Sequence, residues 1–109
     1  MFFSSVSNLD PAGLLEMRAR GPVRLVDVRT DAEWAAGMID GAVHLPLHLL
    51  PIKGDEFGGE VPTVFYCRSG ARSAQACAFL TAKGRSNVYN LEGGIIAWAR
   101  AGHPLSQPA

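Results

Sequence analysis

The stretch Thr63–Ser73, which reads TVFYCRSGARS, predicts a buried strand that ends at a cysteine and continues into a short polar loop. The residues Val64–Tyr66 are strong β-formers, so we expect Cys67 to lie where the strand ends. Gly70 allows a tight turn, in which successive backbone N–H groups can point inward as an anion-binding nest. A helical pattern follows from Ser73, and the N-terminus of that helix would add positive potential at the same place.

This arrangement is typical of a nucleophilic cysteine. A thiol in such a loop has a lowered pKa and is partly ionised at neutral pH. Free cysteines are more often small buried hydrophobes, but Arg68, Gly70 and Arg72 crowd around Cys67 in the sequence and favour the reactive interpretation. Cys77 shares a helical face with alanines, so we expect it to pack in the core, with a resolving thiol as the alternative.

Together with this loop, three other segments are similar to the rhodanese sulfurtransferase family. The stretch Leu25–Arg29 resembles the family's Asp-Val-Arg strand, and Leu91–Gly94 followed by Trp98 resembles its Leu-Glu-Gly-Gly ending. The spacing of its Glu-x3-Gly-His-Ile-x-Gly-Ala segment and a later proline is matched by Glu33, Gly37, Ile39, Gly41, Ala42 and Pro46. Met38 stands where the family usually has histidine. The resemblance spans roughly residues 5–105.

The resemblance implies a three-layer α/β fold with a mainly parallel central sheet of about five strands, flanked by helices on both faces. The residues indicate the same order, because strands alternate with helices along the chain. Expected strands cover 23–28, 42–45, 63–66 and 87–91. Expected helices run from Asp10–Pro11 to Gly21, between Thr30 and Gly37, over 74–80 and over 95–101, with a helical turn near Leu49–Leu50. Gly93–Gly94 predicts a tight connection beside the cysteine loop.

The resemblance also implies a sulfurtransferase that moves sulfane sulfur from a small anionic donor, such as thiosulfate, to a thiophilic acceptor. The sulfur would pass through a persulfide on Cys67, and the acceptor would be a thiol, a protein thiol or cyanide. The loop residues expected to bind the donor are Arg68, Ser69, Gly70, Ala71, Arg72 and Ser73, and the two arginines would attract its sulfonate.

Charged residues near the strand ends are candidates for a supporting role: Asp27, Arg29 and Glu33. They could touch the substrate, but an ion-pair network that holds the loops, with Arg72 included, is the simpler interpretation.

No metal or organic cofactor is expected, because the sulfur of Cys67 itself accepts and then releases the transferred sulfur atom. His44 and His48 have the spacing of helical metal ligands. Pro46 breaks the helix that would align the two imidazoles, and the sequence offers no third ligand nearby.

Three alternatives stay open. The spacing from Cys67 to Arg72 is Cys-x4-Arg, one residue shorter than the Cys-x5-Arg loop of protein phosphatases, so phosphatase action is the minor reading. A non-catalytic rhodanese-like binding module would usually lack the cysteine. A protein-fed sulfur carrier, loaded by a desulfurase, fits the sequence as well as a small-molecule enzyme does.

Composition favours one domain over the 109 residues, with a core of about 5–105 and a short, loose C-terminal tail from Ser106. Ten basic residues balance ten acidic ones, so nothing points to nucleic acid or an anionic membrane. The first five residues read as a mature start without a signal peptide, and two cysteines do not make a disulfide framework. We therefore expect a cytoplasmic protein.

Overall fold

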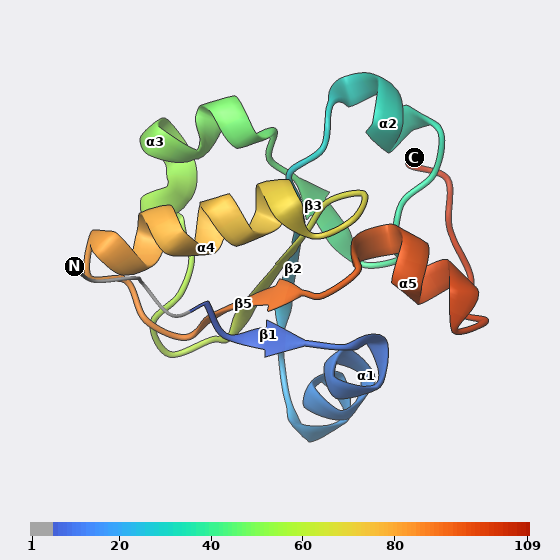
Figure 1. Cartoon of the computed structure of the whole chain (residues 1–109), viewed down its shortest axis with the longest axis horizontal. Coiled ribbons are helices and arrows are strands. Elements are labelled where there is room, and N and C mark those ends of the chain that lie inside the picture. The colour runs from blue at the N-terminus through green and yellow to red at the C-terminus, as the bar shows by residue number, and fades with distance from the viewer. Residues whose placement is uncertain (1–5) are drawn as a thin grey trace.

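The computed structural model describes residues 6–109, so the expectation for the first five residues lies outside the described part. Five strands form one parallel sheet in the order β1-β5-β4-β2-β3, with helices on both faces (Figure 1). The strands are β1 (Asn8–Leu9), β2 (Arg24–Asp27), β3 (Ala42–His44), β4 (Thr63–Tyr66) and β5 (Val88–Leu91). The expected α/β fold is confirmed.

The helices are α1 (Pro11–Arg20), α2 (Asp31–Ala35), α3 (Leu50–Lys53), α4 (Ala71–Ala82) and α5 (Gly94–Arg100). Two 3₁₀ turns, Leu47–Leu49 and Gly54–Glu56, flank α3. No helix within residues 6–109 combines the length and the apolar character needed to cross a membrane.

Alternate strand residues point to opposite faces, so the sheet separates two apolar clusters. The cluster under α1 and α5 contains Leu14, Leu25, Ile39, Val64, Tyr66, Leu91, Ile95 and Trp98. The cluster under α3 and α4 contains Val26, Val28, Leu45, Leu50, Phe65, Cys67, Ala76, Cys77, Leu80 and Val88. The central strand β4 contributes to both, and each of its four residues is buried.

Two helices begin where the sequence predicts, because each has a side-chain cap. The Asp10 carboxylate accepts a hydrogen bond from the N–H of Gly13 at 2.8 Å. At α2 the Thr30 hydroxyl accepts from the N–H of Glu33 at 3.2 Å, and the Glu33 carboxylate accepts from the N–H of Thr30 at 3.0 Å. This capping box orients Glu33 even though α2 is only five residues long.

The structure differs from the sequence-based expectation at two elements. Strand β1 was not predicted, because two residues carry no periodicity, and it exists through its pairing with β5. Helix α4 begins at Ala71, ahead of the predicted Ala74. Gly70 has a φ of 106°, a left-handed conformation that turns the chain directly into the helix.

The prediction of a loose C-terminal tail is wrong at Ser106. The N–H of Met38 donates to the carbonyl of Ser106 at 2.8 Å, and the N–H of Ser106 donates back at 2.7 Å. The indole N–H of Trp98 also donates to the carbonyl of Pro104 at 3.0 Å. The chain end is therefore held against the segment that follows α2.

The turn into α5 fits closely against the cysteine loop, as expected for Gly93–Gly94. The N–H of Ile95 donates to the carbonyl of Cys67 at 2.9 Å, and the N–H of Ile96 donates to that of Arg68 at 3.2 Å. Gly94 has a φ of 59°, and a Cβ placed on it would lie 2.5 Å from both carbonyl oxygens. Only glycine allows this approach.

We expect Gly94→Ala to destabilise the protein by about 2–4 kcal/mol, because it adds a steric clash to the cost of a left-handed backbone. Gly84→Ala is the matched control: Gly84 has a φ of 85°, but no atom lies within 4 Å of its added Cβ. That variant should lose only about 1–2 kcal/mol in urea unfolding. Equal losses in the two variants would contradict the close approach of α5.

Candidate active site

Cys67 directly follows the central strand β4, as the sequence predicts. Its residue surface is 1% exposed. The loop then folds back over the sulfur: the N–H of Gly70 donates to Cys67 Sγ at 3.1 Å, and Ser73 Oγ lies 3.5 Å from Sγ. A buried thiol at the carboxyl end of a parallel strand, with donors aimed at it, is a candidate nucleophile.

The pKa of Cys67 lies below its ordinary value. Burial opposes ionisation, but hydrogen bonds from the Ser73 side chain and from the backbone N–H groups of Ser73, Gly70 and Ser69 outweigh it. Cys77 behaves differently, because burial alone raises its pKa to about 12. Cys77 is 1% exposed in the core beneath α4, so the core-packing prediction for it is confirmed.

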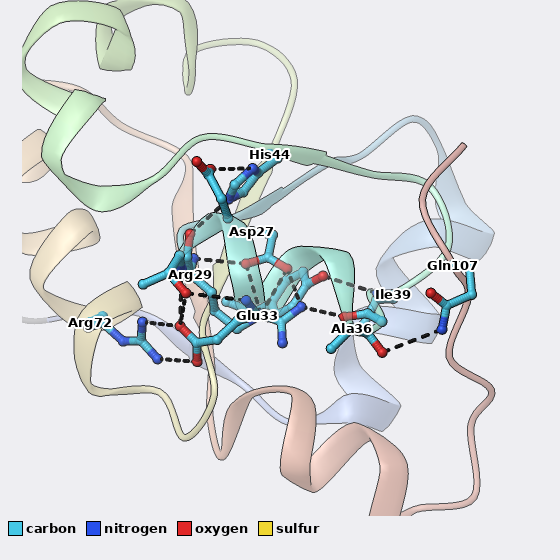
Figure 2. A network of polar contacts seen from close by, with 12 residues as sticks. Asp27, Arg29, Glu33, Ala36, Ile39, His44, Arg72 and Gln107 are labelled. Atoms are coloured by element: carbon cyan, nitrogen blue, oxygen red, sulfur yellow. Dashed lines mark hydrogen bonds and ion pairs between the residues drawn. The ribbon is translucent and has the colours of Figure 1, made fainter.

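Arg72 forms a two-pronged ion pair with Glu33, across the gap between α4 and α2 (Figure 2). Its two terminal nitrogens donate to the two carboxylate oxygens at 2.7 and 2.8 Å. The hydrogen bond from Arg72, together with those from Thr30, lowers the pKa of Glu33 to about 2 despite partial burial. The same pair raises the pKa of Arg72. The network expected around Glu33 therefore includes Arg72.

Asp27 and Arg29 form a second ion pair, which is almost fully buried. The Arg29 guanidinium donates to both oxygens of Asp27 and, at 2.6 Å, to the carbonyl of Gly37 (Figure 2). The Tyr66 hydroxyl accepts from the N–H of Ile39 at 3.0 Å. These contacts tie the end of β2 to the segment after α2. Asp27 and Arg29 therefore hold the structure around the loop together.

The remaining loop side chains face solvent. Arg68, Ser69 and Ala71 are exposed, whereas Gly70 and Ser73 are buried. Arg68 is therefore the loop arginine that an incoming anion can meet without displacing Glu33, which engages Arg72.

A cavity of about 610 Å³ opens beside the loop between the start of α2 and the segment after β3. Arg72 forms part of its wall, and Val28, Pro46, Leu47 and His48 are among the other lining residues. This size is in the range of pockets that hold small molecules.

Sequence reasoning missed one polar residue near the site, Asn90, and weighed another, His44, only as a metal ligand. Asn90 is 4% exposed in β5 and accepts a hydrogen bond from Ser73 Oγ at 2.5 Å. A single amide within an otherwise apolar strand is the signal that could have identified it. His44 Nε2 lies 2.7 Å from the carbonyl of Arg29, and its ring stacks on Trp34 with centroids 4.8 Å apart. The imidazole thus supports the turn before α2.

Comparison with known proteins agrees with this geometry. The profile of the Rhodanese-like domain matches residues 10–101. The chain belongs to this family. The "Sulfurtransferase" of Allochromatium vinosum is 57% identical to this rhodanese-like domain over 86 residues, which cover 79% of this chain and 80% of the relative. The thiosulfate sulfurtransferase GlpE of Pseudomonas entomophila is 37% identical over 95 residues, covering 87% and 86%.

A solved structure supports the same assignment. The rhodanese-like domain protein from Staphylococcus aureus superposes with a TM-score of 0.82 at 31% identity, covering 95% of this chain and all of that one. The family resemblance expected from the sequence is confirmed. At the position where this rhodanese-like domain departs from the family pattern, Met38 is 6% exposed and its backbone pairs with Ser106.

We expect Glu33→Gln to lower stability by about 1 kcal/mol at neutral pH, a small value because the pair is about one-third exposed. The pKa of Glu33 is about 2 against an ordinary value of 4.5. A lowered pKa stabilises the fold above the ordinary value, and this contribution is lost as the pH falls through the folded one. The difference between wild type and Glu33→Gln in urea unfolding should therefore shrink from pH 5 to pH 2.

Glu16→Gln is the control for this variant, because its ion pair with Arg20 is exposed on α1. It should change stability little at any pH. A Glu33→Gln difference that stays constant down to pH 2 would contradict the ion pair.

Proposed function

We propose that this protein is a thiosulfate sulfurtransferase that works through a persulfide on Cys67. The observation that carries the proposal is the buried Cys67 sulfur at the end of β4, with the N–H of Gly70 donating to it at 3.1 Å. A thiol whose pKa is lowered by such donors supplies thiolate at neutral pH. The relatives named sulfurtransferases support the reaction class, and GlpE supports the donor.

The first step is an attack by the Cys67 thiolate on the outer sulfur of thiosulfate. A sulfur–sulfur bond forms to the enzyme while the bond inside thiosulfate breaks, and its electron pair leaves with sulfite. The enzyme then carries a persulfide anion. In the second step the acceptor, cyanide or a thiolate, attacks the outer sulfur and the electron pair returns to Cys67 as thiolate. Charge and electrons balance in both steps without a cofactor.

The loop Arg68–Ser73 stabilises the anion at each stage. Its backbone N–H groups surround the sulfur in a buried setting, where fixed donors act more strongly than water does. Gly70 supplies the donor that the structure places on Sγ. The exposed Arg68 provides the positive charge that attracts the sulfonate of the donor.

The decisive experiment is intact-mass analysis after incubation with thiosulfate, followed by a cyanide chase assayed for thiocyanate. We expect one added sulfur on Cys67 that cyanide removes. Cys67→Ser should take up no sulfur, whereas Cys77→Ser should load normally because its thiol is buried with a raised pKa. Normal turnover by folded Cys67→Ser would disprove the mechanism. Loading by a desulfurase and not by thiosulfate would identify a protein-fed carrier.

Arg68→Ala should raise KM for thiosulfate by about tenfold, because it removes a charge-assisted contact to the donor. The value of kcat at saturating donor should change less, since the bond-breaking atoms keep their N–H donors. Steady-state kinetics with thiosulfate as the varied substrate measures both. Arg100→Ala, which removes an exposed arginine at the end of α5, is the charge-matched control. Equal effects from the two variants would show that only net charge matters.

A further inference from the structure

A chain of hydrogen bonds runs from Cys67 through two buried polar residues to the edge of the sheet. Ser73 is fully buried, and its Oγ lies 3.5 Å from Cys67 Sγ and 2.5 Å from Asn90 Oδ1. Asn90 Nδ2 then donates to Asn8 Oδ1 at 3.0 Å. Asn8 and Asn90 are direct neighbours across the parallel pairing of β1 and β5.

The Ser73 hydroxyl has one proton and three acceptors within reach. Besides Asn90 Oδ1 and Cys67 Sγ, the carbonyl of Gly70 lies 3.2 Å from Ser73 Oγ. A hydroxyl donates one hydrogen bond and accepts two, so donation to Asn90 leaves only lone pairs to face the sulfur. The shortest of the three contacts is the one to Asn90. While Ser73 donates to Asn90, it can accept from a thiol but cannot donate to a thiolate. The Ser73 hydrogen bond that lowers the pKa of Cys67 therefore forms only when the hydroxyl turns from Asn90 to the sulfur.

Asn8 holds the amide of Asn90 in this orientation. Asn8 Nδ2 donates to the carbonyl of Val6 at 3.3 Å, which leaves Asn8 Oδ1 to face Asn90. An oxygen facing Asn90 requires the NH₂ group of Asn90 opposite it, and the carbonyl end of that amide must then point at Ser73. The direction of each hydrogen bond in this series, from the carbonyl of Val6 to the hydroxyl of Ser73, is therefore fixed.

We propose that Asn90 is a positioning residue that, through Ser73, withholds the hydroxyl proton from Cys67 and so stabilises the neutral form of its sulfur. Asn90 does not touch the sulfur. It opposes the backbone N–H groups, which favour the anion. Rotation of the Asn90 amide would reverse the polarity, because an NH₂ group donating to Ser73 Oγ leaves the hydroxyl proton to its two remaining acceptors, the sulfur at 3.5 Å and the carbonyl of Gly70 at 3.2 Å.

This inference rests on the proposed function for its purpose. The Sγ atom of Cys67 itself is anionic as a thiolate but neutral as the inner sulfur of a persulfide, where the charge lies on the outer, transferred atom. A chain that favours a neutral inner sulfur stabilises the loaded state over the free thiolate. Asn90 would thus favour the persulfide state of the reaction cycle, whereas the backbone N–H groups favour the free thiolate.

Other charges near Cys67 act independently of this chain. From α4, Arg72 is close enough for the thiolate to raise its pKa, so its positive charge favours the anion. Arg68 is the next residue along the chain from Cys67 and is exposed. Asn90 on β5 is uncharged. Substitutions in the chain of hydrogen bonds leave both arginines in place.

The test is the pH dependence of Cys67 alkylation by iodoacetamide, followed by mass, which needs no sulfur donor. Asn90→Leu should lower the pKa of Cys67 and speed alkylation below that pKa by about threefold to tenfold, the range that one hydrogen bond contributes. In a Ser73→Ala background the same substitution should have no effect, since no hydroxyl proton remains to be released.

Asn8 provides a second pair of variants at an exposed residue. Asn8→Ala should shift the pKa of Cys67 in the same direction as Asn90→Leu, because it frees the Asn90 amide to rotate. Asn8→Asp keeps an acceptor facing Asn90 and should cause no shift in salt that screens its charge. The two Asn8 variants test the role proposed for Asn90 even if Asn90→Leu does not fold.

An unchanged or raised pKa in folded Asn90→Leu would overturn the proposal, and so would a lowered pKa that persists without the Ser73 hydroxyl. No difference between Asn8→Ala and Asn8→Asp would overturn it as well. If the alkylation shifts appear while thiosulfate fails to load Cys67, the hydrogen-bond chain stands and the proposed function fails.

Discussion

The site depends on the directions in which the loop after β4 points its backbone groups: an N–H group faces the Cys67 sulfur, and two carbonyl groups face α5. The carbonyls of Cys67 and Arg68 point to α5, where the N–H groups of Ile95 and Ile96 satisfy them. The N–H of Gly70 is thereby left to face the sulfur. Without α5 those two carbonyls would compete with the Cys67 sulfur for the N–H groups of the loop, because a buried carbonyl without a hydrogen-bond partner costs free energy. The glycine turn before α5 is what permits the approach.

Most of the strands and helices could be predicted from the sequence, because the signals for them are local. The β-formers before Cys67, the caps at Asp10 and Thr30, and the alternation of strands with helices each act within a few residues. Strand β1 had no such signal, because two residues are a strand only when a neighbour pairs with them. The contact of Ser106 with Met38 likewise needs the folded chain to bring distant backbone together.

The same distinction holds at the site. Cys67 and its loop were predictable, since nucleophile, turn and helix start are adjacent in sequence. The partner of Arg72 was suggested only as part of a network, because Glu33 lies 39 positions away. Asn90 was missed because its partner Ser73 is on another element. The two loop arginines, equal in sequence, end in different surroundings: one is bound to the scaffold and one is exposed.

Glu33 is shared between two tasks, and this has a consequence for how the site can respond to an anion. Its carboxylate caps α2 through Thr30 and separately holds Arg72. An anionic group that competes for Arg72 has to replace one partner only, while the cap keeps α2 folded. The arginine can therefore exchange carboxylate for ligand without local unfolding, so the energetic barrier to that exchange is confined to a single side chain.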